Sequence, residues 1–153
     1  MEVINTFFVK PGVIFFSEEP YKISTVLGSC VSIAMWDFKN KWGGMNHYMY
    51  PHEFKHTKIP DSKIGEKAII QLYKIMIKHD SDKNNIIANV SGGSNNQELS
   101  PYISNENVKI AFKILKDLNI EILKNYTGGN RGKKVIFNNY TGEYIVDNIS
   151  EWK

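Results

Sequence analysis

Two stretches of the chain show helical periodicity, and they interrupt a series of short strand-like runs. Apolar side chains recur at helical spacing in residues 64–78 and again in residues 105–118. Runs rich in Val, Ile, Phe and Thr fill most of residues 3–50, and similar runs predict strands at 86–90, 120–126, 133–137 and 143–146. The order strands, helix, strand, helix, strands predicts an α+β fold with two main helices on largely antiparallel sheet.

Turn and cap residues mark the ends of these elements. The segment from Asp37 to Trp42 predicts a hairpin turn, which would lay residues 30–36 and 42–50 antiparallel and close together. Candidate N-cap side chains precede both helices, and they are Asp61 and Ser62 for the first and Ser104 or Asn105 for the second. The polar run at 91–96 predicts a flexible loop.

Size and composition favour one folded domain over residues 1–153. Hydrophobic residues make up 42% of the chain and charged residues 23%, which is ordinary for a globular protein. The longest apolar runs fall well short of the roughly 20 residues that cross a bilayer. Because the first residues also lack a secretory signal and the chain has a single cysteine, we expect a cytoplasmic protein without membrane insertion.

Charge and motif patterns give little support to nucleic-acid, metal or cofactor sites. The net charge is +3, but Arg131 is the only arginine, so we do not expect a nucleic-acid partner. The pair His52 and His56 lacks a third ligand at a suitable spacing, so we expect no metal. The glycine pairs at 92–93 and 128–129 match neither a P-loop nor a dinucleotide fingerprint, so we expect no cofactor.

The single cysteine, Cys30, is the first candidate for chemistry. It follows Gly28 and Ser29, where a tight turn would bring backbone amides of Ser29 and Cys30 close to the sulfur to bind an oxyanion. His47 lies across the predicted hairpin, where an imidazole could take the thiol proton and later return it to a leaving group. The alternatives are a buried structural cysteine and an ordinary strand histidine.

A third group is needed to orient the imidazole, and the residues leave four candidates. Ser24 and Thr25 offer hydroxyls just upstream of the thiol, and Asp37 and Asn46 are also within the strand region. Hydroxyl side chains on strands are common for conformational reasons alone. The choice therefore stays open at the level of sequence.

Two blocks of this region resemble one known family. The segments "ISTVLGSCVSIAMWD" and "GGMNHYMYP", which carry Cys30 and His47, are similar to those of the CheD family, the chemoreceptor glutamine deamidases of bacterial and archaeal chemotaxis. Nearly the whole chain shares the resemblance, including "IGEKAI", the glycine pair at 92–93, Asn107 and "TGGNRGKKVIF" followed by "TGEY". The resemblance implies an α/β sandwich similar to bacterial toxin deamidases.

The same resemblance implies roles for individual residues. Cys30 would be the nucleophile and His47 the general base and acid, with a hydroxyl upstream; counting back from the cysteine gives Ser24, and Thr25 is next to it. Backbone amides of Ser29 and Cys30 would hold the oxyanion. The residues assigned to binding are Gly28, Gly44 and Asn46.

The resemblance also implies partners and leaves a competing interpretation. The substrate would be the cytoplasmic domain of methyl-accepting chemoreceptors, with a CheC-type phosphatase as a second partner and no cofactor. The alternative is a regulatory module that binds these partners without catalysis; a thiol peptidase is less favoured. Departures from the family pattern at Ser91, Ser94 and residues 104–106 are expected to change a partner surface away from the thiol.

Overall fold

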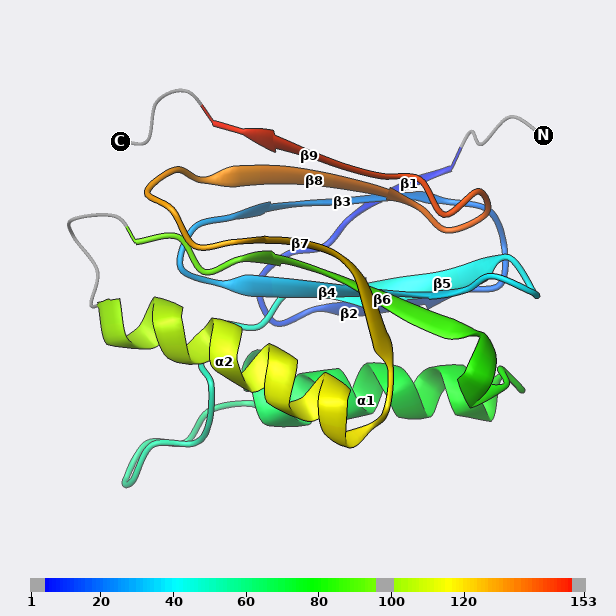
Figure 1. Ribbon diagram of the computed structural model, residues 1–153. Helices are drawn as coiled ribbons and strands as arrows, with labels where there is room; N and C mark the ends of the chain where they lie inside the picture. The colour runs from blue at the N-terminus through cyan, green and yellow to red at the C-terminus, as the bar shows by residue number, and fades with distance from the viewer. Residues whose placement is uncertain (1–4, 96–100, 150–153) are drawn as a thin grey trace.

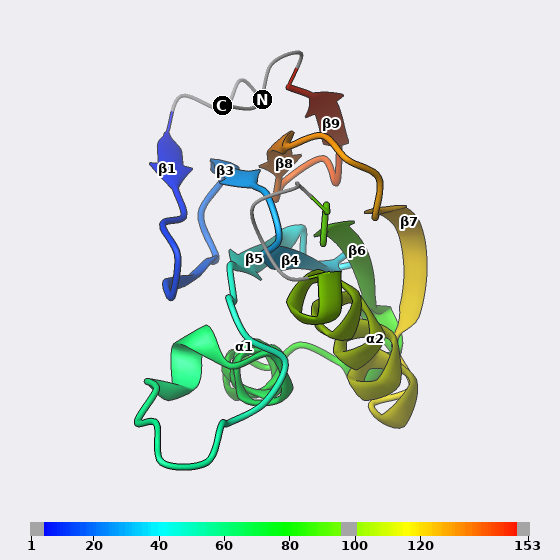
Figure 2. The ribbon, with the colours of Figure 1, turned by 90° about the vertical axis from the view of Figure 1, so that its left-hand side faces the viewer.

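The protein is built of three layers, two sheets and a layer of helices. The computed structural model describes residues 5–95 and 101–149. Figure 1 shows a four-stranded sheet above a five-stranded sheet, with α1 and α2 beneath the second sheet, and Figure 2 shows the same layers end on. In spatial order, the first sheet contains β1 (Thr6–Phe8), β3 (Lys22–Leu27), β8 (Lys133–Asn138) and β9 (Tyr144–Asn148).

The second sheet contains, in spatial order, β2 (Ile14–Ser17), β5 (Trp42–Asn46), β4 (Val31–Asp37), β6 (Ile86–Gly92) and β7 (Glu121–Thr127). The helices are α1 (Gly65–Lys78) and α2 (Pro101–Asp117), with short 3-10 turns η1 (Asp61–Lys63) and η2 (Lys83–Asn85). Strand pairs are antiparallel except β1 with β3 and β6 with β7. The predicted α+β fold with largely antiparallel sheets is therefore confirmed.

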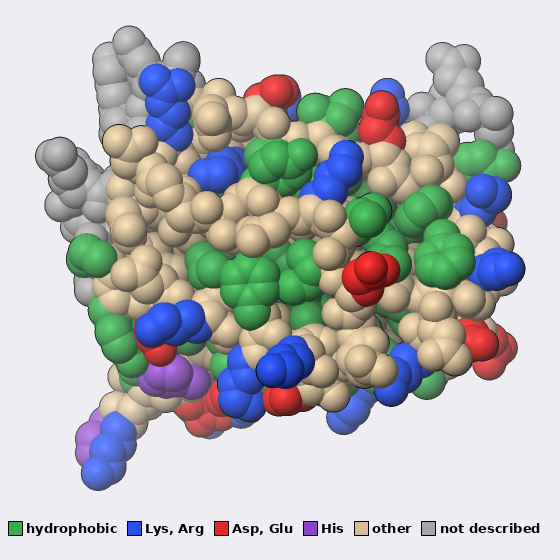
Figure 3. Space-filling view, viewed as in Figure 1, with side chains coloured by type: hydrophobic (Ala, Val, Ile, Leu, Met, Phe, Trp, Pro, Cys, Tyr) green, Lys and Arg blue, Asp and Glu red, His purple; other side chains and the backbone are tan. Residues whose placement is uncertain are grey.

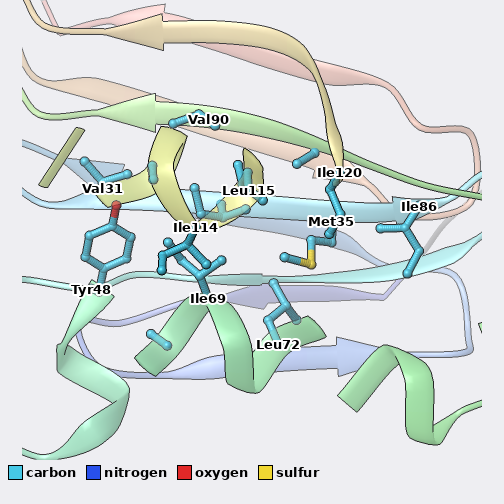
Figure 4. Close-up of a cluster of buried hydrophobic side chains, with 14 of the residues drawn as sticks. Val31, Met35, Tyr48, Ile69, Leu72, Ile86, Val90, Ile114, Leu115 and Ile120 are labelled. Carbon is cyan, nitrogen blue, oxygen red and sulfur yellow. The ribbon is translucent and has the colours of Figure 1, made fainter. Parts of the chain in front are cut away.

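Alternate residues of β4 divide the interior into two apolar clusters. Val31, Ile33 and Met35 face the helices and join a cluster with Leu72 and Leu115 (Figure 4). Ala34 faces the other sheet and packs with Met45, Leu27 and Phe137 between the two sheets. Because side chains alternate along a strand, a residue's position in β4 determines which of the two layers it enters.

The hairpin between β4 and β5 confirms the predicted turn at residues 37–42. Asp37 accepts hydrogen bonds from the backbone N–H of Lys39 at 3.0 Å and of Asn40 at 2.9 Å, so its buried carboxylate holds the turn. Lys41 completes the turn with a φ of 60°.

The predicted N-cap residues are wrong for both helices, although α1 begins within one residue of its predicted start. Ile64 precedes α1 and contributes no side-chain cap, because Asp61 and Ser62 belong to the preceding 3-10 turn. Helix α2 begins at Pro101, before Ser104 and Asn105, since proline is well suited to a first helical position where its missing N–H is not needed. No helix among the described residues has the length and apolar character needed to cross a bilayer.

The predicted flexible loop at 91–96 is wrong for residues 91–92, which form a strand, and the part of it that lies outside regular secondary structure, residues 93–95, is largely buried. Ser91 and Gly92 belong to β6, and the side chains of Ser91 and Ser94 are buried. Ser91 lies between the sheets and shares a hydrogen bond with the Tyr144 hydroxyl. Asn96 is outside the described residues. Tertiary contacts override the polar composition of this segment.

Candidate active site

The hairpin of β4 and β5 puts the thiol and the imidazole on one face. Beyond the regular strands, Val31 and Tyr48 exchange two backbone hydrogen bonds of 3.2 and 3.0 Å. Cys30 and His47 each precede one member of this pair, so they are diagonal neighbours whose side chains leave on the same side. Cys30 packs against the cluster between the sheets, whereas Val31 and Tyr48 face the helices.

Thr25 reaches His47 from the other sheet and determines which ring nitrogen carries hydrogen. The Thr25 Oγ1 lies 2.7 Å from His47 Nδ1 and donates a 2.7 Å hydrogen bond to the Val9 carbonyl. Since the hydroxyl has one hydrogen and gives it to the carbonyl, it accepts from the His47 Nδ1–H. His47 Nε2 is then the bare nitrogen that can act as a base.

The other candidates for the third group are not brought to the imidazole. Ser24 is next to Thr25 on β3, so its side chain leaves on the opposite face of that strand. Asp37 holds the hairpin turn at the other end of β4. Asn46 precedes His47 and faces the helix side, where its Oδ1 accepts a 2.9 Å hydrogen bond from the Ile33 N–H. Alternation along the strands therefore favours Thr25.

Three consecutive carbonyls of the turn between β3 and β4 are held by neighbouring segments. The donors are Ser94 N–H to Gly28 O at 2.8 Å, Asn107 Nδ2 to Ser29 O at 3.0 Å, and Gly93 N–H to Cys30 O at 2.9 Å. In a planar trans peptide, the N–H points opposite to the C=O. The Gly28 carbonyl shares a peptide with the Ser29 N–H, and the Ser29 carbonyl shares one with the Cys30 N–H. Because the two carbonyls point toward their donors, the two N–H groups point away from them.

Those two N–H groups are available to a ligand. No residue other than Cys30 itself accepts a hydrogen bond from the backbone N–H of Ser29 or Cys30 in the described part of the chain. The Cys30 N–H and the Ser29 hydroxyl both interact with the Cys30 sulfur and oppose the rise of its pKa. An oxygen atom bound to a carbon that the sulfur attacks would lie beside these donors, which is the requirement for an oxyanion hole.

Burial leaves both reacting groups neutral near pH 7. It raises the pKa of the Cys30 thiol to about 11 and lowers the pKa of His47 to about 4. A neutral imidazole can accept a proton and a neutral thiol can donate one. Neutral groups of this kind can exchange a proton during an attack by sulfur, in contrast to a thiolate and imidazolium formed beforehand.

The end of β6 and the segment after it contact the turn at residues 28–30, which we call the thiol turn. A Cβ at Gly92 would lie 2.2 Å from the Cys30 carbonyl oxygen, and Gly92 has a φ of 111°, so only glycine fits there. Ser94 bonds to the same turn through its N–H. The expectation that Ser91 and Ser94 belong to a remote partner surface is therefore wrong, although Asn105 is exposed on α2.

Two buried polar residues near the turn were given no role by the sequence. Asn107 was part of the family resemblance, and its side chain holds Ser29. The Lys133 ammonium donates to Ser94 Oγ at 3.1 Å and to the Gly128 carbonyl at 2.9 Å, which ties the β7–β8 loop to the segment after β6. Both contacts join segments far apart in sequence, so no local pattern could have indicated them.

Two of the three residues assigned to binding lie away from the thiol. A Cβ at Gly44 would meet the Phe15 carbonyl oxygen at 2.2 Å, so this glycine allows β2 and β5 to approach. Asn46 supports β4 from the helix side, as described above. Gly28 does lie in the thiol turn, where its carbonyl is held by Ser94. The described residues include no cluster of three or more His, Cys, Asp or Glu suited to a metal ion.

The fold and these contacts define an α+β protein in which the Thr25 hydroxyl contacts the His47 imidazole between two sheets, and the Cys30 thiol leaves its hairpin on the same face as that imidazole. The family model described as "CheD chemotactic sensory transduction" matches residues 49–148. A "Probable chemoreceptor glutamine deamidase CheD" of Trichlorobacter lovleyi is 32% identical over 94% of this chain and 90% of its own. Proteins of the same name from Clostridium acetobutylicum and Sulfurimonas denitrificans are 36% and 28% identical, over 85% and 94% of this chain and 82% and 94% of theirs.

The chain therefore belongs to the CheD family. The family model begins after Cys30 and His47, but the similarity to the first of these relatives extends over 146 residues.

Proposed function

We propose that this protein deamidates glutamine side chains of chemoreceptors, converting them to glutamate during adaptation in chemotaxis. The names of its relatives support the reaction and the substrate. The observation that carries the chemical assignment is the thiol turn, whose two N–H groups are bonded to no other described residue and lie at a cysteine on the same face as the His47–Thr25 pair. The cytoplasmic domain of the receptor is the substrate, and the reaction takes place in the cytoplasm.

The first half of the reaction forms a thioester. Cys30 Sγ attacks the side-chain amide carbon while its proton moves to His47 Nε2, and the carbonyl oxygen becomes an oxyanion bound by the N–H groups of Ser29 and Cys30. Thr25 accepts from Nδ1–H, so it stabilises the imidazolium that forms. The C–N bond then breaks, and His47 gives its proton to the departing ammonia.

The second half hydrolyses the thioester. A water molecule attacks the same carbon and gives a proton to His47, and the oxyanion forms again in the same site. The C–S bond then breaks, the sulfur regains the proton from His47, and glutamate is released. All proton transfers use the chain's own groups, and the sum of the two halves is glutamine plus water giving glutamate plus ammonia.

A docking role is a second function that we propose beside catalysis. Strand β7 is an edge strand of its sheet and exposes Leu123 and Tyr126, with 59% and 42% of their surfaces accessible. Figure 3 shows apolar side chains gathered on this face of the molecule. An exposed apolar edge is suited to a protein partner, and the resemblance implies a CheC-type phosphatase. Leu123→Lys should weaken that complex in a titration and leave receptor deamidation intact.

The deamidase assignment is tested with a purified chemoreceptor cytoplasmic fragment. Peptide mass spectrometry measures conversion of glutamine to glutamate by the wild type and by Cys30→Ala. We expect conversion by the wild type and a loss of at least about 1000-fold in the variant. Equal conversion by Cys30→Ala would exclude the thiol mechanism, and binding without conversion by the wild type would leave the docking role alone.

A further inference from the structure

We infer that Asn107 is a positioning residue for this reaction, fixing the peptide whose N–H, that of Cys30, binds the oxyanion. The inference rests on the proposed deamidase function and adds to it a residue from α2. No described contact places Asn107 on a reacting atom, so it acts through the turn that it holds.

The Asn107 side chain joins the thiol segment to the imidazole segment. Its Nδ2 donates two hydrogen bonds, one to the Ser29 carbonyl at 3.0 Å and one to the Met49 carbonyl at 3.0 Å. Ser29 immediately precedes Cys30, and Met49 follows His47 by two residues. Because an amide nitrogen has two hydrogens, this one group uses both of them to set the two segments relative to each other.

The bond to Ser29 controls the direction of a catalytic N–H. The Ser29 carbonyl and the Cys30 N–H belong to one planar peptide and point in opposite directions. If the carbonyl loses its donor, the peptide is free to rotate and can present its oxygen where the N–H should be. The same oxyanion that the N–H stabilises would then be repelled.

Asn107 is the one described side chain that donates to a carbonyl of this turn. The Gly28 and Cys30 carbonyls are held by backbone N–H groups of Ser94 and Gly93, which a side-chain substitution does not remove. A substitution at Asn107 therefore tests one carbonyl of the turn and leaves the other two held.

The surroundings of Asn107 indicate a role beyond stability. The residue is fully buried, and its backbone carbonyl accepts a 2.5 Å hydrogen bond from the Tyr48 hydroxyl. Its Oδ1 is buried and has no partner among the described residues. An unpaired buried oxygen destabilises the folded chain, so stability alone gives a weak reason for this side chain, whereas its two donors have a clear use.

The test compares Asn107→Leu with Asn139→Leu. Asn139 is also fully buried and donates through Nδ2 to backbone carbonyls, of Ser17 at 3.1 Å and Glu19 at 3.0 Å, but it lies at the β8–β9 turn. Each variant is assayed for kcat and KM on the receptor fragment, and for alkylation of Cys30 by iodoacetamide, a substitution that forms no oxyanion. Asn107→Ser, with a single hydroxyl hydrogen for two carbonyls, replaces Asn107→Leu if that variant does not fold.

We expect kcat to fall about 10- to 100-fold in Asn107→Leu, with KM within about twofold of wild type and an alkylation rate that falls much less than kcat. Asn139→Leu should lower the melting temperature and leave kcat within about twofold. An unchanged kcat in the Asn107 variant, or an alkylation rate that falls as far as kcat, would overturn the inference while the deamidase function stands. Absence of conversion by the wild type would instead overturn the proposed function, and the inference with it.

Discussion

The two ends of the sandwich use buried polar side chains for different purposes. At the end with the β8–β9 turn, Asn139 accepts from the Tyr21 N–H at 2.7 Å and donates to the carbonyls of Ser17 and Glu19, so both ends of its amide are used. At the end with the thiol turn, Asn107 Oδ1 and Ser32 Oγ are buried without partners among the described residues. Figure 1 shows these turns at opposite ends of the strands.

The difference between paired and unpaired buried polar atoms indicates which end of the sandwich is less optimised for stability. Buried polar groups are normally satisfied, and each exception calls for an explanation. At the thiol end, the backbone carbonyls of the turn accept hydrogen bonds from neighbouring segments, whereas the N–H groups of Ser29 and Cys30 bond to no other described residue. These N–H groups are suited to bind a substrate. At the other end, both polar atoms of the Asn139 amide are paired, and their bonds join the β8–β9 turn to the end of β2 and the segment after it. Changes at the thiol end should therefore affect reaction rate more than stability, and changes at the far end should do the reverse.

The largest effect on rate after loss of the thiol itself is expected at His47. His47→Ala removes the group that takes and returns the proton, and general acid–base catalysis contributes about 100- to 10,000-fold. We expect kcat on the receptor fragment to fall by about 1000-fold while circular dichroism shows the same fold. A fall of less than about tenfold would mean that another group moves the proton.

Stability should depend on pH through the same histidine. Burial lowers the pKa of His47 from 6.5 to about 4, so between these values the unfolded chain binds more protons and stability increases with pH. The free energy of unfolding should fall by about 3 kcal/mol from pH 7 to pH 4 on this account. Urea denaturation across that range measures it, with His47→Gln as the variant that should lose this part of the dependence.

The reactivity of the Cys30 thiol should also depend on pH, because burial shifts its pKa upward, in the direction opposite to the shift of His47. Burial raises the pKa of Cys30 from 9.0 to about 11, so the thiolate fraction at neutral pH is very small. Alkylation of Cys30 by iodoacetamide should increase about tenfold per pH unit up to about pH 11. A rate that levels off below pH 8 would instead indicate a thiolate and imidazolium pair in the free enzyme.

A smaller effect separates the two neighbouring hydroxyls of β3. Thr25→Val keeps the shape of the side chain but removes the oxygen that accepts from His47 Nδ1–H, so kcat should fall by about 10- to 100-fold. Ser24→Ala should leave kcat within about twofold, because its side chain leaves the opposite face of the strand. Initial rates on the receptor fragment measure both effects. A larger loss of kcat in Ser24→Ala than in Thr25→Val would assign the supporting hydroxyl to Ser24.

The smallest effect on rate is expected at the far end. Asp37→Ala removes the carboxylate that holds the hairpin through the N–H groups of Lys39 and Asn40. The loss should cost about 1–2 kcal/mol of stability, measured by urea denaturation, with kcat within about twofold of wild type. If kcat instead fell as strongly as in Thr25→Val, the two ends would not be independent.

The order of elements could be predicted because each signal is local. Helical periodicity in residues 64–78 and the turn residues after Asp37 lie within short windows. The burial of Ser94 could not be predicted, since it depends on contacts with the distant thiol turn and the β7–β8 loop. Polar composition alone gives no information on such contacts.

The choice between Ser24 and Thr25 was within reach of the sequence. Ile23, Thr25 and Leu27 share one face of a strand by alternation, and both apolar members are buried. That pattern predicts that Thr25 faces inward, whereas counting back from the cysteine gives Ser24. The pairing of Asn107 with Ser29 spans 78 residues and required the structure.

The most direct test of the thiol's role is to look for the acyl group on Cys30 itself. Wild-type protein and the chemoreceptor fragment are mixed, quenched in acid within the first turnover, digested and examined by mass spectrometry. We expect a receptor peptide joined to the Cys30 peptide with loss of ammonia, and no such species with Cys30→Ala. An acyl group on a different residue, or single-turnover glutamate formation by Cys30→Ala at the wild-type rate, would contradict the account.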